Sequence, residues 1–451
     1  MTTPALARLP GVCLFMFALT PAAQAEDLLD IYKLAQASDP IWSSAQANYR
    51  ANIEIGPQSR SLLLPAISAG LGIYKINQET ISTNQATGVV TVRPPARYNS
   101  SGYEVQFRQH LFNMSGFAGY AQGRIAVNLA EAELAIARQD LIQRTAEAYF
   151  DVLIAQDSFE FARTEKKAIQ GQLNLAQRNF DVGNATVVDV HEARARQDLT
   201  AALEVSAQTD LQVKQEALAT ITGIPPATAL ARPAARLQLS APEPADPEHW
   251  LQAAREQNLQ IKVREHQQAM AEKQIAIYRG RHYPTLDLVA SRTYNDAGGG
   301  VFGIGIESTT DQIGLQLQVP IYQGGFGSSK VREGEARRDQ ARDALTLSKR
   351  QTARQTREAY LALTSGAARI VALEQALNSS QKALEATLLG YESGVRTGVE
   401  VLNAQRELYR TKRDLSQARY NWLTSRLRLK AAIGTLNEAD LAEINSFLTQ
   451  G

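Results

Sequence analysis

The chain has 451 residues, of which 44% are hydrophobic, so it is long enough to bury more than one ordinary core. It carries 47 basic and 46 acidic residues, and this balance gives no electrostatic reason to expect a nucleic-acid partner. Its single cysteine, Cys13, excludes an intramolecular disulfide framework. Stability must therefore come from packing.

Residues 1–25 have the pattern of a secretory signal peptide. Arg8 precedes the apolar run "GVCLFMFALT", and the small residues Ala23 and Ala25 form the expected cleavage site. A membrane anchor is the alternative reading, but the apolar run is well short of the ~20 residues that a spanning helix needs. We expect cleavage after Ala25, which removes Cys13 and leaves no cysteine to accept a lipid at the new N-terminus.

Beyond the signal, the pattern predicts long helices interrupted by pairs of strands. No proline occurs between Pro95 and Pro225, and none occurs after Pro320, so long helices are permitted there. Asp39 as a cap and Pro40 in the first turn open the earliest helix. The expected elements in chain order are helix 40–60, strands 66–76 and 103–112, helices 116–180, 187–222 and 248–281, strands 285–293 and 312–321, and helices 326–391 and 398–432.

The predicted strands alternate between apolar and polar residues. In "QIGLQLQVPI", for example, Ile313 and Leu315 lie on one face and Gln312 and Gln316 on the other. The strands are about ten residues long, the length that a tilted strand needs to cross a bilayer. A half-buried sheet of a soluble domain is the alternative for any single strand. We expect polar loops over 77–96 and 295–311 to join the strands as two hairpins.

The four strands of one chain cannot close a membrane barrel, because the smallest closed barrels have about eight strands. An open sheet edge in lipid would leave unpaired backbone groups. Beyond the signal, no apolar run is long enough for a transmembrane helix, so strands must make any crossing. The chain is therefore expected to oligomerise, with strands from two or three copies closing the barrel.

The helices carry the 3-4 apolar spacing of coiled coils. A helix over 116–180 would be about 100 Å long at 1.5 Å per residue, far longer than a globular helix. The helices 187–222 and 40–60 placed end to end would match it, and 248–281 with 398–432 would match 326–391. The expected seam residues in the second half are Ile370, Leu373, Leu377, Leu384, Tyr391, Val401, Ala404, Leu408, Thr411, Leu415, Ala418, Trp422 and Leu429.

The chain is a tandem duplication of one unit. The stretch "FDVGNATVVDVHEA" from Phe180 returns as "YESGVRTGVEVLNA" from Tyr391, and "EAY" at Tyr149 returns at Tyr360, in both cases 211 positions later. The predicted division is a signal peptide over 1–25, a first repeat over 26–223, a proline-rich linker over 224–247 and a second repeat over 248–451. The linker holds six prolines, too many for a helix.

These motifs resemble the TolC family of outer-membrane exit ducts, and the resemblance covers nearly the whole mature chain. The segments that carry it are "LAQASDP", "FDVGNATVVDV", "GYESGVRTGVEVLNA" and the closing "ARYNWLTSRLRLKAAIGTLNEADL". The resemblance implies a mainly α fold with membrane β: a homotrimer with a twelve-stranded barrel in the outer membrane and a twelve-helix tunnel through the periplasm. It also implies an equatorial belt built from the linker and the C-terminal region.

In that family each repeated turn is a helical hairpin at the periplasmic tip, so the resemblance assigns a gate. Gly183 and Gly394 would be the turn glycines. Tyr391 and Arg396 would tie the inner hairpin to its neighbours, with Asp189 as the expected acceptor for Tyr391. Glu400 would form an acidic constriction ring. Asn403 stands at the second ring position, where the family has an acid, so a second carboxylate ring is not expected.

The function that the resemblance implies is a passive exit duct for type I protein secretion, small-molecule efflux or both. A periplasmic adaptor and an inner-membrane ABC or proton-driven exporter would open it at the tip. The alternative is a periplasmic coiled-coil scaffold or adaptor without a membrane barrel. An enzyme, a cofactor and a metal site are not expected, because "GGGVFGIG" is not followed by the helix of a phosphate loop and the histidines lack metal-ligand spacing. The histidines are His110, His191, His249, His266 and His282.

Overall fold

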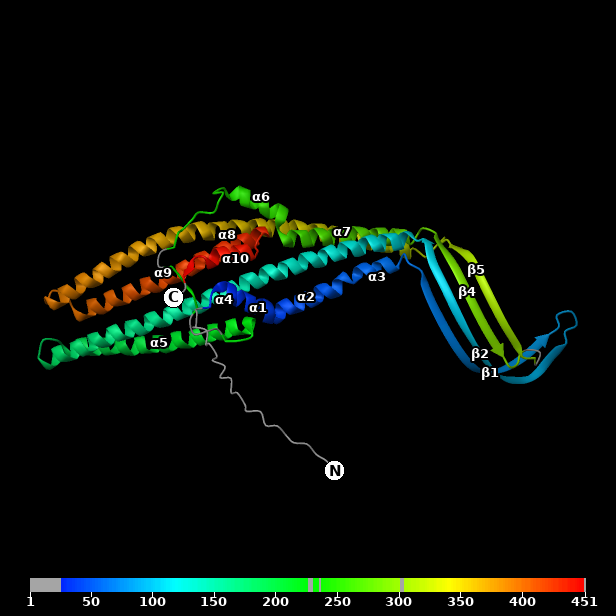
Figure 1. Ribbon diagram of the computed structural model, residues 1–451, viewed down its shortest axis with the longest axis horizontal. Coiled ribbons are helices and arrows are strands. Elements are labelled where there is room, and N and C mark those ends of the chain that lie inside the picture. The colour runs from blue at the N-terminus through cyan, green and yellow to red at the C-terminus, as the bar shows by residue number, and fades with distance from the viewer. Residues whose placement is uncertain (1–25, 226–229, 235–236, 301–303, 450–451) are drawn as a thin grey trace, which may run out of the picture.

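The computed structural model describes residues 26–225, 230–234, 237–300 and 304–449. The predicted signal peptide therefore lies outside the described residues, as do parts of the linker and of the "GGGVFGIG" loop. The protomer is elongated, with a curved sheet at one end and two helical hairpins at the other (Figure 1). The shorter helices α1 (Leu28–Ser38), α6 (Pro247–Gln257) and α10 (Glu438–Asn445) lie around the middle, and we call this middle region the belt.

Two long hairpins dominate the chain, and their bounds follow the sequence repeat. The first consists of α4 (Met114–Asp181) and α5 (Val187–Thr222), and the second of α8 (Phe326–Glu392) and α9 (Gly398–Ile433). The end of α8 and both ends of α9 lie 211 positions after those of α4 and α5. The duplication predicted from the sequence therefore holds for the helices.

Shorter helices continue the line of α5 and α9 toward the sheet. In the first repeat these are α2 (Pro40–Ile53) and α3 (Ile55–Ser61), which lie along α4, and in the second it is α7 (Leu259–Gly280), which lies along α8 (Figure 1). Two short helices end to end do match one long helix, as the lengths predicted. In addition, α7 and α9 pack against α4, so the two repeats share an interface.

The prediction of one helix over 248–281 is wrong. The chain forms α6 (Pro247–Gln257) and α7, separated at Asn258, whose ψ of 126° is extended. The Asn258 side chain accepts a hydrogen bond from Ile261 N at 3.1 Å and donates one to Ala432 O at 2.8 Å. The break lets α6 turn away from α7 and cover α8 in the belt (Figure 1). The expected helix over 40–60 is likewise divided, at Glu54.

The four predicted strands form one antiparallel sheet in the order β1-β2-β4-β5. They are β1 (Ala66–Thr83), β2 (Val90–Phe112), β4 (Thr285–Ala297) and β5 (Ile306–Gln318). The register places Ile67, Phe107, Ala290 and Ile313 in one row across all four strands. Apolar residues therefore share one face of the sheet, and this face is open in the single chain, with Leu71 83% exposed.

The strands are longer than predicted, so the expected loops over 77–96 and 295–311 are largely wrong. β1 and β2 continue through most of the first segment, and the hairpin turns over 84–89. The register of β1 against β2 shifts between Gln78 and Thr80, opposite the segment that holds Pro94 and Pro95. Proline has no N–H for a sheet ladder, so the irregularity falls where the prolines lie.

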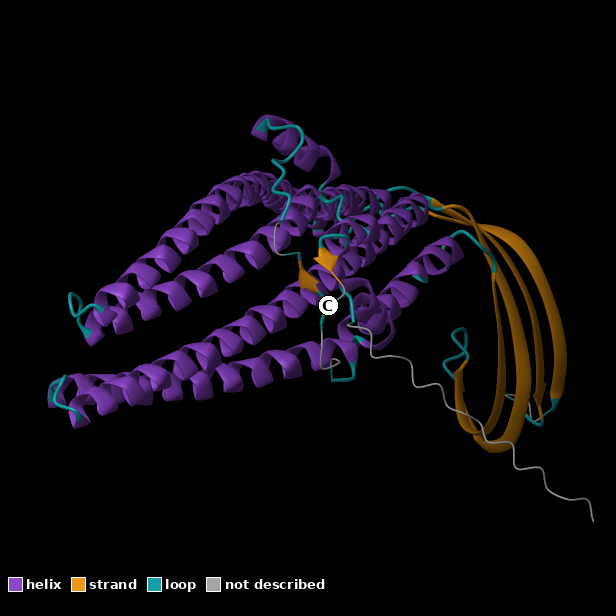
Figure 2. Cartoon of the chain, turned by 60° about the vertical axis from the view of Figure 1, so that its left-hand side comes forward, coloured by secondary structure: helices purple, strands orange, loops and turns teal. Residues whose placement is uncertain are grey.

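The largest apolar core lies in the belt, where α1, α4, α9 and the linker meet. Tyr149, Phe150 and Trp422 are among its largest buried side chains. Two helices there were not predicted: α1 (Leu28–Ser38) and α10 (Glu438–Asn445). A short pairing of β3 (Arg232–Pro233) with β6 (Leu448–Thr449) joins the linker to the C-terminal segment beside the helices (Figure 2). The belt therefore contains the linker and C-terminal segments that the resemblance implied.

Most of the predicted coiled-coil seam is buried. Ile370, Val401, Leu408, Leu415 and Trp422 are each less than 9% exposed. The prediction was incomplete for α9, because Leu402, Tyr409 and Tyr420 on a second face of this helix are buried as well. The reason is that α9 packs against two long helices, α8 of its own hairpin and α4 of the other.

Candidate gate at the helical tip and the belt above it

Each long hairpin closes with the same turn. α4 ends at Asp181 and α8 at Glu392, and two residues later Gly183 and Gly394 have φ of 78° and 75°. This left-handed conformation is costly for a residue with a Cβ, so glycine is the residue that the turn requires. The repeated glycines thus serve to reverse the chain at the tip (Figure 2).

The next helix starts with the same capping box in both repeats. Thr186 and Thr397 are the N-caps of α5 and α9, and Asp189 and Glu400 are their third helical residues. The Asp189 carboxylate accepts from Thr186 N at 2.9 Å, and the Glu400 carboxylate accepts from Thr397 N at 2.8 Å. The two acids predicted for the gate are therefore equivalent in the repeats, and each satisfies an exposed end of its own helix.

Tyr391 connects the two hairpins at the tip. Its hydroxyl accepts a hydrogen bond from Asn179 Nδ2 at 3.2 Å, which joins the last turn of α8 to the last turn of α4. Asp189, the expected acceptor for Tyr391, instead accepts from the backbone and the hydroxyl of Thr186. The capping box orients Asp189 along its own helix, and Asn179 takes the place beside Tyr391.

Arg396 and Glu400 form an ion pair at the start of α9. The distance from Arg396 Nη1 to Glu400 Oε1 is 2.7 Å, and the side chains are 57% and 40% exposed. The backbone N–H of Thr397 and then the Arg396 guanidinium hold the pKa of Glu400 below its usual value. Glu400 is thus a stable carboxylate near neutral pH, and its partner Arg396 belongs to the same protomer.

Asn403 lies one turn further along α9 and is exposed. Its Oδ1 is 3.5 Å from Arg196 Nη2 of α5, a long and weak contact between the hairpins. The predicted tip residues of both repeats therefore lie close to the two turns, and the structure adds Asn179 and Arg196 as their partners. A sequence pattern could not single these out, because each is an ordinary polar residue on a helix surface.

In the belt, the repeated "EAY" motif anchors the linker twice. Tyr149 is fully buried, and its hydroxyl donates to Ala231 O at 2.7 Å. Tyr360, its repeat equivalent, donates to Ala245 O at 2.6 Å from a more exposed position. Both acceptors are backbone carbonyls of the predicted linker, so each repeat binds one part of the linker by a tyrosine hydrogen bond.

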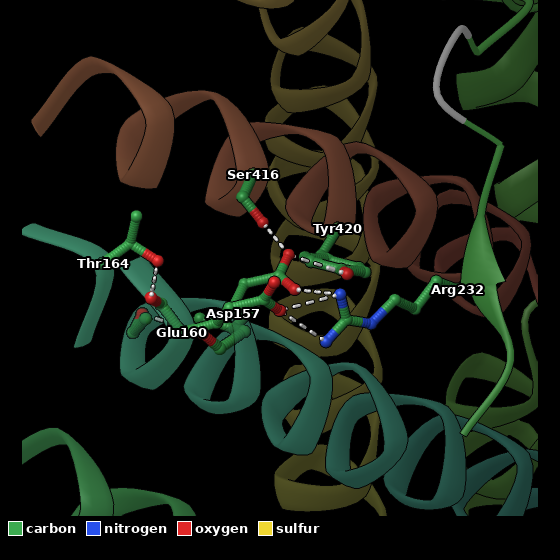
Figure 3. A network of polar contacts seen from close by, with 8 residues as sticks. Asp157, Glu160, Thr164, Arg232, Ser416 and Tyr420 are labelled. Atoms are coloured by element: carbon green, nitrogen blue, oxygen red, sulfur yellow. Dashed lines mark hydrogen bonds and ion pairs between the residues drawn. The ribbon is translucent and has the colours of Figure 1, made fainter. Parts of the chain in front are cut away.

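A polar network fastens α4, α9 and the linker together (Figure 3). Asp157 of α4, whose side chain is 14% exposed, accepts hydrogen bonds from Ser416 and, at 3.0 Å, from the Tyr420 hydroxyl of α9. Arg232 of β3 lies 3.5 Å from Asp157 and 3.1 Å from Glu160 of α4. The linker thus contributes a cation to a contact between two helices of different repeats.

Burial controls the protonation of the belt hydroxyls. Burial, and then the Asp157 carboxylate, raises the pKa of Tyr420, so its hydroxyl remains a hydrogen-bond donor. Burial also raises the pKa of Tyr32 to about 12, with Glu438 as the next cause. The Tyr32 hydroxyl donates to Glu438 Oε1 at 3.1 Å and links α1 to α10. In both contacts a neutral hydroxyl donates to a carboxylate of another element.

Sequence reasoning missed the Asp157 network. One signal was present, because the repeats differ at these positions: Asp157 corresponds to Ala368, and Tyr420 corresponds to Thr209, at the 211-residue offset. A polar residue in one repeat whose equivalent is small or less polar in the other marks a contact that only one repeat makes.

The chemistry available at the tip and belt is that of hydrogen bonds and ion pairs. Within the described ranges, no three His, Cys, Asp or Glu side chains are grouped so that they could hold a metal ion. In the same ranges, none of the helices combines the length and the apolar character needed to span a membrane.

The architecture defines the class of protein. A tandem repeat of very long helical hairpins, joined to an antiparallel sheet with one apolar face, is the protomer of a TolC-like channel. The solved structure of the outer membrane protein VceC from Vibrio cholerae matches with a TM-score of 0.76 at 20% identity, covering 90% of this chain and 96% of that one. At this identity the match supports the fold.

Sequence comparison identifies the family. The family described as outer membrane efflux protein matches residues 31–224 and 250–435. The outer membrane protein TolC of Vibrio cholerae is 34% identical over 432 residues, covering 95% of each chain. The alkaline protease secretion protein AprF of Pseudomonas aeruginosa is 30% identical, covering 97% of this chain and 90% of the relative.

The chain belongs to the outer membrane efflux protein family. It is therefore an outer-membrane export duct whose helical part extends into the periplasm, as the resemblance implied. The recurrence of the turn is explained by the two hairpins of each protomer, which both end at the same tip.

Proposed function

We propose that three copies of this chain close into one duct, and that the duct passively conducts cargo delivered by an inner-membrane transporter and a periplasmic adaptor. The observation that carries this proposal is the open sheet. β1 and β5 are its two edges, and the apolar face includes Ile67, Leu71 and Ile313, which are 72%, 83% and 80% exposed in the single chain. Lipid can cover that face only if the edges pair with other copies, because unpaired backbone groups are costly in lipid.

Three copies would give a barrel of twelve strands and six helical hairpins around one axis. The exposed apolar residues of α5 and α8 support the same arrangement, because they need a partner in water. Val205 and Val213 of α5 are 64% and 58% exposed, and Leu361 and Val371 of α8 are 57% and 59% exposed. Two copies would give the smallest closed barrel but only four hairpins, which we disfavour because the relatives named TolC resemble this chain over nearly its whole length.

Protein export is the cargo that the relatives favour. AprF and the proteases secretion protein PrtF of Dickeya chrysanthemi, 28% identical over 94% of this chain, are named for protein secretion. The efflux protein BepC of Brucella suis is 24% identical over 93% of the chain. Type I secretion through an ABC exporter is therefore the preferred reading, with small-molecule efflux through a proton-driven exporter as the second.

The tip is proposed as the gate. Tyr391 and Arg396 would keep the hairpins closed, and three Glu400 side chains near the axis would form a ring that favours cations. Asp189 supports the turn beside this gate by capping α5. Exposed links of this kind contribute little individually, so docking of a partner can break them.

Single-channel current through the purified trimer in a planar bilayer tests this function. Small, cation-selective steps are expected, with loss of selectivity in Glu400→Ala and larger steps in Tyr391→Phe combined with Arg396→Ser. Chemical crosslinking in detergent should yield a trimer. Folded protein that never forms a channel and remains monomeric would favour the periplasmic scaffold instead.

A further inference from the structure

The tandem repeat creates two kinds of seam between hairpins in the proposed trimer. Within one chain, α4 packs against α9, and we call this contact the intra-chain seam. The 211-residue offset puts α8 in the place of α4 and α5 in the place of α9. The equivalent contact is therefore between α8 of one copy and α5 of the next, which we call the inter-chain seam. The exposed apolar residues of α5 and α8 described above lie on the helices of this seam.

The intra-chain seam is fastened by buried charged and polar groups below the belt core. Glu165 of α4 is only 3% exposed, and its carboxylate accepts a hydrogen bond from Arg413 of α9 at 3.0 Å. Eight residues nearer the belt, Asp157 makes its contacts with Ser416 and Tyr420. All of these partners come from the other repeat, so they hold hairpin to hairpin.

The inter-chain seam lacks these groups. Glu165 and Arg413 correspond to Ala376 and Ala202 at the repeat offset. The positions of Asp157, Ser416 and Tyr420 are taken by Ala368, Val205 and Thr209. Neither a carboxylate nor a guanidinium stands at any of these inter-chain positions, so the two seams differ in kind although their helices follow the same repeat.

The position of the Glu165–Arg413 pair along α4 determines over what length the two hairpins can separate from the tip. Glu165 lies sixteen residues before the end of α4, about 24 Å at 1.5 Å per residue. Between it and the turns, the hydrogen bonds found between the two hairpins are those from Asn179 to Tyr391 and from Arg196 to Asn403, at 3.2 Å and 3.5 Å. An apolar cluster, in which Leu402 of α9 packs with Ile169 and Ala176 of α4, also lies in this interval. The first buried ion pair between the hairpins on moving from the tip toward the belt is therefore Glu165 with Arg413.

We propose that Glu165 and Arg413 form a latch that limits how far opening spreads from the tip toward the belt. This inference rests on the proposed function as a gated duct. When the tip contacts break, the hairpins of one protomer separate up to the latch and remain together above it. The inter-chain seam, which lacks the latch, adjusts by sliding of apolar side chains.

The physical reason is the difference in burial between latch and tip. Moving Arg413 away while Glu165 stays packed between the helices would leave a buried carboxylate without its cation, which costs far more than breaking an exposed contact. Removing both side chains avoids that unpaired charge and gives the intra-chain seam the same two alanines that the inter-chain seam carries at Ala376 and Ala202. The double variant therefore isolates the latch.

The experiment measures single-channel currents of the trimer with Glu165→Ala and Arg413→Ala in a Tyr391→Phe background. About a tenfold rise in the ratio of open to closed time is expected, equivalent to ~1.4 kcal/mol and within the coupling energies of contacting residues. The matched control is Lys166→Ala with Glu204→Ala. That pair, 2.7 Å apart, joins α4 to α5 inside one hairpin, and its removal should leave the ratio unchanged.

Hydrogen exchange on the Tyr391→Phe trimer supplies a second measurement that does not depend on the latch variant folding. Amides of α4 and α9 between the turns and the latch should exchange faster than in the wild type, and those above the latch should be unchanged. Faster exchange extending without a break past Asp157, or a channel whose open ratio is the same with and without the latch, would overturn the proposal. The absence of any channel from the wild type would refute the duct itself.

Discussion

The belt and the tip of this protein use the same few residue types in opposite environments. In the belt, the Asp157 side chain is 14% exposed, accepts hydrogen bonds from Ser416 and Tyr420, and forms an ion pair with Arg232. At the tip, Glu400 is 40% exposed and pairs with Arg396 four residues away on its own chain segment. The residue chemistry is shared, but the belt contacts join distant parts of the chain and the tip contacts are mostly local.

This difference explains how the belt of one protomer can be rigid while its tip changes conformation. A buried carboxylate holds its partners strongly because losing one leaves an unsatisfied group away from water. An exposed pair competes with water and contributes little. The belt can therefore serve as the fixed frame against which the tip moves. The following predictions test that contrast, from the largest expected effect to the smallest.

Asp157→Ala should give the largest loss. It removes the acceptor of Ser416 and Tyr420 and one of the two carboxylates that pair with Arg232, so the free energy of unfolding should fall by about 3 kcal/mol. Urea unfolding in detergent, followed by circular dichroism, measures it. Asp151→Ala is the matched control, because its ion pair with Lys214 is 49% exposed on the Asp151 side, and it should cost at most about 1 kcal/mol. Equal losses in the two variants would remove the distinction between belt and surface.

Tyr149→Phe and Tyr360→Phe separate burial from bonding within the belt. Both tyrosines donate to a linker carbonyl, but only Tyr149 is fully buried. Tyr149→Phe leaves the buried Ala231 carbonyl without this donor and should cost about 1–2 kcal/mol, whereas Tyr360→Phe should cost about 0.5 kcal/mol because water can replace it. The same urea titration compares them. A larger loss from Tyr360→Phe would contradict the role given to burial.

Thr186→Ala and Thr397→Ala test the two capping boxes of the tip. Each removes the side chain that accepts the third helical N–H, at a cost of about 1 kcal/mol. Because the turns are at one end of the protomer, the effect should appear as faster hydrogen exchange in the first turns of α5 and α9 with no change in the belt. Serine at the same positions retains the acceptor, so Thr186→Ser and Thr397→Ser should behave as wild type. Exchange in the serine variants as fast as in the alanine variants would argue against capping.

Acidification should affect the tip least and last. The pKa of Glu400 is lowered in the folded protein, so the stabilisation from its Thr397 and Arg396 contacts is present above the ordinary pKa of 4.5 and is lost as the pH falls through the lower folded value. Exchange at the start of α9 should therefore accelerate only below pH 4.5. Glu400→Gln should show the faster rate at every pH. A pH response of unchanged size in this variant would assign the effect to another group.

Several features could be predicted because each is decided within a few residues of sequence. The repeated glycine-containing turn and the alternation of the strands are local patterns, and the structure has both. The helix from Val187 to Thr222 has the predicted bounds, because a threonine cap begins it and Gly223, with φ of 75°, ends it.

Other features were missed because they depend on which elements meet. The extension of β1 and β2 through residues predicted as loop is supported by pairing across the hairpin, which outweighs the polar composition of that segment. The break at Asn258 makes sense only beside Ala432, which accepts its side-chain hydrogen bond. The partner of Tyr391 is Asn179 because the ends of α4 and α8 lie together.

By itself, the sequence determined that this protein is a duplicated pair of long hairpins with strands of membrane length, since periodicity, proline placement and the repeat are all properties of the linear chain. Only the tertiary structure decided which contacts one repeat makes and the other does not. The repeat offset makes α4 and α8 equivalent, yet folding brings α4 against α9 and gives Asp157 and Glu165 partners that Ala368 and Ala376 do not need. A duplicated sequence predicts two equal halves, whereas packing one half on the other requires their contact faces to differ.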